Sequence, residues 1–169
     1  LRSMNPLGYT EREINEIKKV ADIEILEEVY RSDVFIFQND ERLVTRVFSY
    51  DLDNGDQQVL NEVYLTEGRL PRNSGEIIIS DERQENSGFE VGSSVSFVAP
   101  EDVETGDVLK ETNYTIVGKF NSPLYISYEK EQTNIGSGKV QLIAYLPKGD
   151  FKLGKPSELF IKVKGSETL

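Results

Sequence analysis

The chain has 169 residues, 37% hydrophobic and 29% charged, which is enough to bury the core of one domain or of two small lobes. Its formal net charge of -11 argues against nucleic acid and anionic lipid headgroups as direct partners, because both need a basic surface. Cysteine and histidine are absent, which excludes disulfides, thiol nucleophiles, zinc–thiolate sites and histidine-dependent triads. The sequence also lacks an apolar run of about 18 residues that would span a bilayer.

The first predicted elements are an edge strand over Leu1–Met4 and a helix over Tyr9–Ala21. Thr10 and Glu13 form the S/T-x-x-E capping box, in which each side chain accepts a hydrogen bond from a backbone N–H at the helix start. The apolar residues of this segment fall on one face, so we expect the helix to lie on a sheet. Strands are then predicted over Asp22–Tyr30, Val34–Phe37 and Leu43–Tyr50.

A hairpin is expected at Asp53–Asp56, because Asn-Gly accepts the positive φ of a type I′ turn, and Val59–Leu65 is its predicted second strand. Gly68–Pro71 forms a corner. The acidic segment Pro100–Asp107 reads as a loop, and Gly136–Gly138 as a hinge or hairpin tip. The remaining predicted strands are Ile77–Ile79, Ser94–Ala99, Asn113–Phe120, Leu124–Ser127, Val140–Leu146 and Leu159–Val163, with a turn at Pro147–Phe151.

Few helices and many short strands indicate an α+β fold. The elements near the two chain ends suggest one α/β lobe into which a β-rich lobe is inserted. The corner at Gly68–Pro71 and the glycines at Gly136–Gly138 set the predicted boundaries. Lobe A comprises residues 1–70 and 139–169, and lobe B comprises residues 71–138. The chain begins inside a predicted strand, so we expect it to be a fragment of a longer protein.

Two patterns resemble ligand loops but depart from them. The run Asp51-x-Asp53-x-Gly55-Asp56 with Glu62 resembles a calcium loop, yet its glycine is at the fifth position instead of the sixth, and an ordinary hairpin turn is the better interpretation. The run Gly136-Ser137-Gly138-Lys139 resembles part of a phosphate loop, but Thr133 and Val140 stand where glycine and Ser or Thr are needed. The sequence therefore predicts no metal, no cofactor and no catalytic residue.

Adjacent acidic residues occur at Glu27-Glu28, Asp81-Glu82 and Glu101-Asp102. With 30 acidic residues such pairs arise by chance, although two facing carboxylates of a glycosidase remain an open alternative. Aromatic residues offer a second open alternative, since tyrosines belong both to binding faces and to half-buried strands. The candidates are Tyr30, Tyr50, Tyr125, Tyr128 and the segment Ser122–Ile126, which is either core or a docking surface.

Two longer motifs resemble a known family. The stretch Glu67-Gly68-Arg69-Leu70-Pro71, continued by Gly75-Glu76-Ile77-Ile78-Ile79, is similar to the "EGR-x-P…GEI-x-I" signature of FtsX-like, MacB-type ABC transporter permeases. The stretch Tyr114–Ser127 is similar to the "Y-T-V-V-G-x-x-x-S-P-x-Y-I-S" segment of large permeases of this group. The resemblance extends from Leu7–Thr10 to Ile161–Gly165 and departs at Val91–Val95, where the family usually has Gly-Asp.

This resemblance implies a βαβ porter-like lobe with an inserted β-rich lobe (MacB periplasmic-core-like). Residues 1–169 would be a single extracellular module on the outer face of the cell membrane, in a Gram-positive-type bacterium, without enzymatic activity. It would transmit ATP-driven motion from a cytoplasmic ABC ATPase, contacted through the membrane part of the protein, in efflux, lipoprotein release, peptide resistance or cell-wall control. The alternatives are a secreted or surface carboxylate-using carbohydrate hydrolase and a stand-alone ligand-binding or adhesion module.

That role carries three expectations. Leu1 and Leu169 should lie together at one end, with the inserted lobe projecting away from it. The acidic segments Asp81–Gly88 and Pro100–Asp107 should either contact a cationic peptide or protein or be ordinary solvated loops. The isolated domain should be monomeric, because its net charge opposes self-association at low salt.

Overall fold

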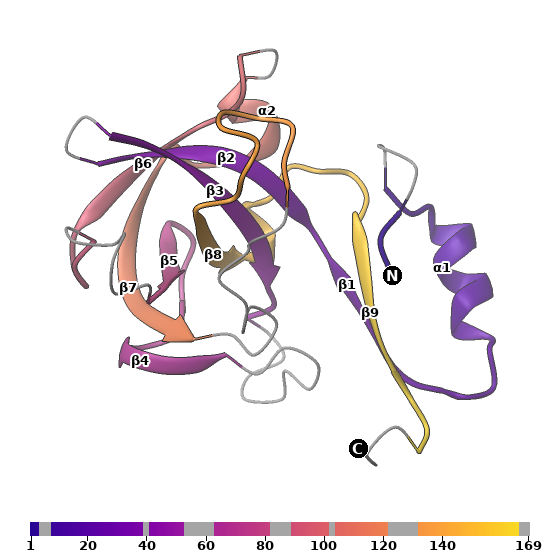
Figure 1. Ribbon diagram of the computed structural model, residues 1–169. Coiled ribbons are helices and arrows are strands. Elements are labelled where there is room, and N and C mark those ends of the chain that lie inside the picture. Colours follow the sequence, from indigo (N-terminus) through magenta and orange to yellow (C-terminus); the bar gives the residue numbers. More distant parts are fainter. Residues whose placement is uncertain are drawn as a thin grey trace.

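The computed structural model describes residues 1–3, 8–38, 41–52, 63–81, 89–101, 104–121 and 132–165. Within these residues the chain is rich in sheet and poor in helix, which confirms the α+β expectation at this coarse level (Figure 1). None of the described helices is long and apolar enough to cross a membrane. The elements are α1 (Glu11–Lys18), β1 (Ile23–Val29), β2 (Arg31–Gln38), β3 (Glu41–Tyr50), β4 (Tyr64–Gly68), β5 (Glu76–Ser80), β6 (Ser94–Val98), α2 (Thr105–Val108), β7 (Asn113–Asn121), β8 (Leu142–Pro147), the 3-10 turn η2 (Lys148–Asp150) and β9 (Glu158–Val163).

A small sheet lies at the chain ends. Strands β1 and β9 pair antiparallel, with Leu26 opposite Ile161. Leu1 exchanges backbone hydrogen bonds with Leu159 at 2.7 and 2.8 Å, so residues 1–3 run along the other edge of β9, as the predicted edge strand requires. We call residues 1–3, α1, β1 and β9 together the terminal unit; Figure 1 shows it to one side of the remaining strands.

Helix α1 begins where the capping box places its start. The Glu13 N–H donates to Thr10 Oγ1 at 3.3 Å, and the Thr10 N–H donates to Glu13 Oε2 at 2.7 Å. Ile14 is the buried residue of the helix. The helix is therefore stabilised locally at its N-terminus and buries only a narrow apolar stripe against the small sheet.

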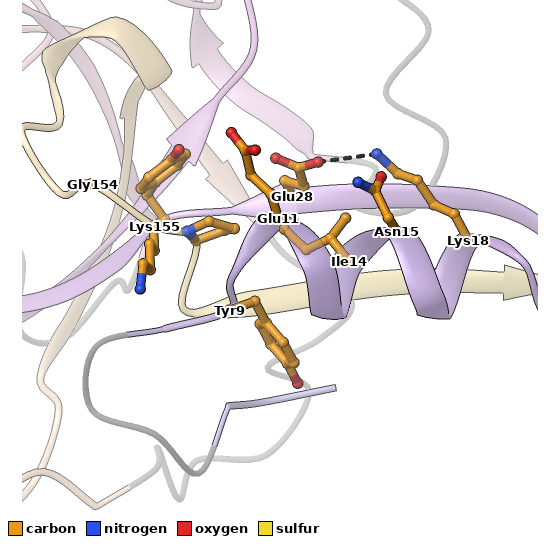
Figure 2. A pocket seen from close by; sticks show the side chains of 10 residues that line it. Tyr9, Glu11, Ile14, Asn15, Lys18, Glu28, Gly154 and Lys155 are labelled. Atoms are coloured by element: carbon orange, nitrogen blue, oxygen red, sulfur yellow. Dashed lines mark hydrogen bonds and ion pairs between the residues drawn. The ribbon is translucent and has the colours of Figure 1, made fainter.

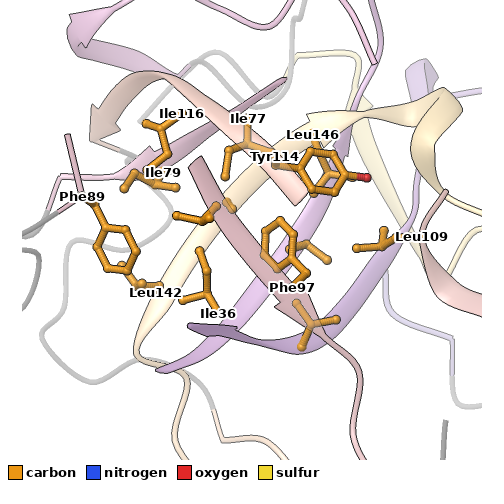
Figure 3. Packing of buried hydrophobic residues seen from close by; sticks show 14 of the residues in the cluster. Ile36, Ile77, Ile79, Phe89, Phe97, Leu109, Tyr114, Ile116, Leu142 and Leu146 are labelled. Carbon is orange, nitrogen blue, oxygen red and sulfur yellow. The ribbon is translucent and has the colours of Figure 1, made fainter. Parts of the chain in front are cut away.

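The seven remaining strands form one sheet, and six of them close into a ring. We call this whole sheet the barrel. Their order is β4-β7-β5-β8-β3-β2-β6, and β6 pairs back onto β7. Pairs β3–β8 and β5–β7 are parallel, and the others are antiparallel. Strand β4 lies outside the closed ring, along the second half of β7. Apolar side chains fill the interior, with Phe97 and Tyr114 in edge-to-face contact at 5.1 Å (Figure 3).

A second apolar cluster covers the outer face of the same strands. Alternation along each strand separates the two faces, because successive side chains of a strand point in opposite directions. Thus Ile77 and Ile79 face the interior while Ile78 faces outward. Val29 of β1 is buried in the outer cluster, and Phe160 of β9 packs against it. The terminal unit therefore packs on the outside of the barrel.

Strand pairing crosses the predicted lobe boundaries. Strand β8, assigned to lobe A, is hydrogen-bonded both to β3 of lobe A and to β5 of lobe B, and β2 pairs with β6 across the same boundary. The structure instead separates the terminal unit from the barrel. Glycine and proline signals locate reversals of the chain, and they do not specify which distant strands pair afterwards.

The predicted partner of β3 was also wrong. Of Val59–Leu65 the structure describes residues 63–65, and of these Tyr64 and Leu65 belong to β4 and pair with β7. Both edges of β3 are already taken by β2 and β8, so no edge remains for a hairpin partner. The Asp53–Asp56 turn and the Leu124–Ser127 strand lie outside the described residues. The turn expected at Pro147–Phe151 is the 3-10 turn η2.

Candidate functional site

The terminal unit is connected to the barrel at Tyr30, the single residue between β1 and β2. Its backbone N–H donates to Ser49 Oγ at 3.0 Å, and its carbonyl accepts from the Ser49 N–H at 2.9 Å. The Tyr30 ring lies 6.0 Å from the Phe151 ring, and Lys148 Nζ lies 5.6 Å from its centre. A chain that passes from one sheet into another through one residue has little freedom to bend. Tyr30 is thus one of the two covalent connections between the two parts; the segment between η2 and β9 is the other.

An ionic cluster lies beside this junction. The Glu158 side chain, at the start of β9, is mostly buried, and its Oε1 atom lies 3.0 Å from Arg2 Nε and 2.8 Å from Arg31 Nη1. Burial lowers the pKa of the Arg31 guanidinium, and the nearby positive charge of Arg46 lowers it further. Glu158 therefore supplies negative charge where cationic side chains from several strands converge.

A second ion pair, between Arg46 and Asp33, continues this cluster on the outside of β2 and β3. Arg46 on β3 is 1% exposed and donates to Asp33 Oδ1 and Oδ2 at 2.7 and 2.8 Å. Burial alone would raise the pKa of Asp33, but hydrogen bonds from Arg46 and Thr133, together with the charges of Arg46 and Arg31, lower it. Arg46 Nη2 also donates to the Gln132 carbonyl at 3.2 Å. This pair fastens the loop of residues 132–139 to the outside of β2 and β3.

The corner between β4 and β5 accounts for the first family motif. Arg69 Nη1 and Nη2 donate to the two Glu76 carboxylate oxygens at 2.8 and 2.6 Å, and the Arg72 N–H donates to Glu76 Oε2 at 2.8 Å. The hydrogen bonds from Arg69 lower the pKa of Glu76 to about 2. Gly68 has a φ of 74°, which few L-residues adopt. The motif residues therefore build a corner.

The two family motifs touch each other. The Arg69 N–H donates to the Val117 carbonyl at 2.9 Å, so the corner of the first motif crosses β7 in the second. A Cβ atom on Gly118 would lie 2.5 Å from the Arg69 carbonyl oxygen. Glycine is needed at this crossing because two backbones pass at a distance that leaves no room for a side chain.

Asp150 joins both motifs to η2. Its buried carboxylate accepts from Ser74 Oγ and, at 2.9 Å, from the Gly75 N–H of the first motif. Tyr114 of the second motif lies nearby, and burial, together with the Asp150 charge, raises the pKa of its hydroxyl. Because the chain lacks histidine, Ser74 and Asp150 are not part of a Ser-His-Asp triad, and their contact holds the first motif against η2.

An open groove of about 420 Å³ lies between α1, β1 and the turn before β9 (Figure 2). Tyr9, Tyr30 and Ile14 supply its apolar surface. Lys18 on α1 bridges to Glu28 on β1 at 3.2 Å across it. Acidic and basic side chains both line the groove, so its charge favours no single class of ligand.

The two runs that resemble ligand loops do not assemble into sites within the described residues. Asp51 is the described carboxylate of the calcium-like run; residues 53–62 lie outside the description. In the phosphate-like run, a Cβ atom on Gly136 would lie 2.7 Å from the Val44 side chain, so this loop packs on the barrel. Among the described residues, no group of three or more acidic side chains is placed to hold a metal ion.

The adjacent carboxylates and the tyrosines are dispersed. Glu28 faces α1, whereas Glu27 is half-buried, and burial and the neighbouring charge of Asp51 raise its pKa. Tyr50 belongs to the outer cluster and Tyr30 to the junction. Several of the remaining candidates lie outside the described residues: Glu82, Asp102, Tyr125, Tyr128 and Ser122–Ile126.

Sequence reasoning missed the Glu158 cluster. Arg2 and Glu158 are 156 positions apart, and no local motif links either of them to Arg31. The available signal was a charged residue at the start of a predicted apolar strand, which ordinarily indicates a solvated strand end. Only the pairing of residues 1–3 with β9 shows that this end is buried.

No family model and no curated protein sequence matches the chain. Solved structures do match its fold, among them extracytoplasmic domains of ABC-type transporters. The extracellular domain of the noncanonic ABC-type transporter YknZ from Gram-positive bacteria matches with a TM-score of 0.55 at 12% identity, over 96% of this chain and 76% of that one. The periplasmic region of MacB from Actinobacillus actinomycetemcomitans has a TM-score of 0.47 at 10% identity, over 91% and 64%.

At 12% identity the likeness to YknZ concerns the fold. It agrees with the fold that the two motifs imply through their resemblance to MacB-type permeases. The motifs and the fold agree because the motif residues form the corner and the β7 crossing described above.

Proposed function

We propose that the chain is the extracellular domain of an FtsX/MacB-like ABC transporter permease, located between two membrane spans on the outer face of the cell membrane. The single observation that carries this proposal is the fold shared with the YknZ extracellular domain over 96% of the chain. The role is mechanical: the domain passes motion from membrane helices, driven by a cytoplasmic ATPase, to a substrate or partner outside.

The placement of the chain ends supports this role. Leu1 pairs with Leu159, and β9 continues beyond it to Val163, so the described ends belong to one small sheet. Membrane spans attached there would leave from the same side of the molecule, with the barrel projecting away (Figure 1). Leu169 itself lies outside the described residues. Motion would enter the terminal unit and reach the barrel through Tyr30.

The acidic segments of the barrel are the proposed contact regions for a partner: Asp81 lies beside Phe120 at the end of β7, and residues 104–107 lie at the opposite end, near Lys152. Of the two acidic segments, the description includes Asp81, Pro100, Glu101 and residues 104–107. A cationic peptide or protein suits such a surface better than an anionic polymer. Efflux, lipoprotein release, peptide resistance and cell-wall control all use such a contact, and a Gram-positive-type cell surface is the proposed setting.

The full-length gene and its product test the proposal. We expect a hydrophobic span shortly before Leu1, further spans after Leu169, and co-purification of a cytoplasmic ABC ATPase with the full-length protein. Charge reversal at Asp81 and Glu101 should weaken the cellular phenotype of the transporter without unfolding the domain. A signal peptide followed by this domain and a stop codon would contradict the permease role and favour a secreted hydrolase or binding module.

A further inference from the structure

Ser157, the residue immediately before β9, is hydrogen-bonded to three segments at once: β1, β2 and residues 1–3. The Ser157 N–H donates to the Val29 carbonyl at 3.0 Å, and Ser157 Oγ accepts from the Arg31 N–H at 2.9 Å. On the opposite edge the Ser157 carbonyl accepts from the Ser3 N–H at 3.0 Å. The entry strand, by which we mean residues 1–3, is thus held to the β1–β2 connection through a single short stretch of β9.

Glu158 adds the side-chain link between the same segments. Its Oε1 atom contacts Arg2 of the entry strand at 3.0 Å and Arg31 of β2 at 2.8 Å. Glu158 is 7% exposed, so solvent screens these contacts far less than it screens an ion pair on the open surface. Removing the carboxylate would leave the mostly buried Arg31 facing Arg46 without this compensating charge.

We propose that Glu158 is a positioning residue whose carboxylate locks the entry strand and barrel strand β2 onto β9, so that these three segments move as one rigid body. The consequence for transport rests on the proposed function: displacement of a membrane span attached before Leu1 would then reach β2 directly, without first bending α1 or β1. Ion pairs that are mostly buried are suited to such a task, because they specify geometry more reliably than they add stability.

Amide hydrogen exchange of the 169-residue chain tests the lock without the transporter. In Glu158→Gln we expect exchange of the Ser3, Leu159 and Arg31 amides to accelerate about tenfold or more, since a hydrogen-bonded contact with a charged group is lost. The amides of Ile78 and Ile79 in the barrel should be unchanged. Uniform acceleration throughout the barrel, or no acceleration at the three amides, would overturn the proposal.

Two further variants sharpen this test. Arg2→Gln should accelerate Ser3 and Leu159 but leave Arg31 unchanged, because only the entry strand loses its contact. Glu24→Gln is the matched control: its partner Lys162 also lies on β9, but at 3.7 Å and with Glu24 46% exposed. Removing that pair should change none of the amides named above, and an equal effect from this control would contradict a special role for Glu158.

A disulfide offers a rescue experiment, because the chain contains no other cysteine. Arg2 and Glu158 are directly opposite in an antiparallel bridge, and the hydrogen-bonded pairs flank them. Such a non-hydrogen-bonded pair has Cα atoms about 4.5 Å apart, which is within disulfide range. In the double variant Arg2→Cys/Glu158→Cys, the reduced form should show fast exchange at Ser3 and Leu159, and the oxidised form should restore slow exchange.

In the full-length transporter the oxidised double variant should keep its ATP-driven activity and the reduced form should lose part of it. Loss of activity on oxidation would show that the entry strand must leave β9 during the cycle, and would overturn the rigid-body proposal. Failure of the proposed function can be told apart from failure of the lock. A gene without flanking membrane spans would exclude the role in transport, whereas the exchange rates of the isolated chain would still show whether Glu158 holds the three segments together.

Discussion

Glu76 allows a quantitative test of the corner that the first motif builds. Its pKa falls from an ordinary 4.5 to about 2 because Arg69 and the backbone of residues 72–73 donate to its carboxylate. A pKa difference of this size corresponds to about 3 kcal/mol of folding free energy. Because the Arg69 side chain is 40% exposed, solvent weakens the pair, and we expect roughly half of that amount. Glu76→Gln should thus destabilise the domain by about 1–2 kcal/mol at pH 7.

The dependence on pH has a definite sign. The pKa of Glu76 is lower in the folded state than in the unfolded state, so its contribution is fully present above about pH 4.5 and is lost as the pH falls towards 2. Urea unfolding of wild type and Glu76→Gln at several values between pH 3 and pH 7 measures this. The free-energy difference should shrink steadily as the pH falls.

Glu67→Gln is the matched control. Glu67 is 55% exposed and pairs with Lys119 at 3.2 Å, close to the same corner. We expect its effect on the free energy of unfolding to stay below about 0.5 kcal/mol at every pH. A Glu76 effect as small as that of Glu67, or one that does not change with pH, would refute the assignment of Glu76 as the charge that holds the corner.

Three further outcomes are expected. Gly118→Ala should lower the free energy of unfolding, measured with urea, by about 2 kcal/mol or more, because the new Cβ meets the Arg69 carbonyl, whereas Gly106→Ala, with open space around it, should not. Asp150→Ala should destabilise the domain by about 1–3 kcal/mol, measured by thermal unfolding, since Ser74 and the Gly75 N–H lose a buried acceptor. Sedimentation should show a monomer at micromolar concentration and low salt, because of the net charge of -11, and a tight dimer would contradict this.

The sequence predicted those elements well that are stabilised by residues close together in the chain. The capping box of Thr10 and Glu13 forms as expected, because both partners lie within one turn of the chain. The predicted strands Leu43–Tyr50, Asn113–Phe120 and Val140–Leu146 match β3, β7 and β8 to within a few residues, because runs of apolar and β-branched residues favour a strand locally. The same reasoning predicted a β3 hairpin partner that the strand pairing contradicts, and lobe boundaries that the strand pairing crosses.

The candidate site shows the same division. The first motif was noticed as a signature, and the structure explains it by the pairing of Arg69 with Glu76, seven residues apart. The Tyr30 junction and the Glu158 cluster left no comparable mark, because their partners lie 19 to 156 positions away. Sequence spacing carries no information about contacts between such distant residues.

By itself the sequence determined the absence of cysteine and histidine chemistry, the acidic surface, the helix start at Thr10 and the strands, all of which depend on composition or on neighbours along the chain. Only the tertiary structure decided that β6 closes the barrel onto β7, that the two motifs cross at Gly118, and that Arg2, Arg31 and Glu158 meet. Strand pairing joins distant segments through backbone groups that every residue carries. Which strands pair is therefore decided by the packing of the whole chain.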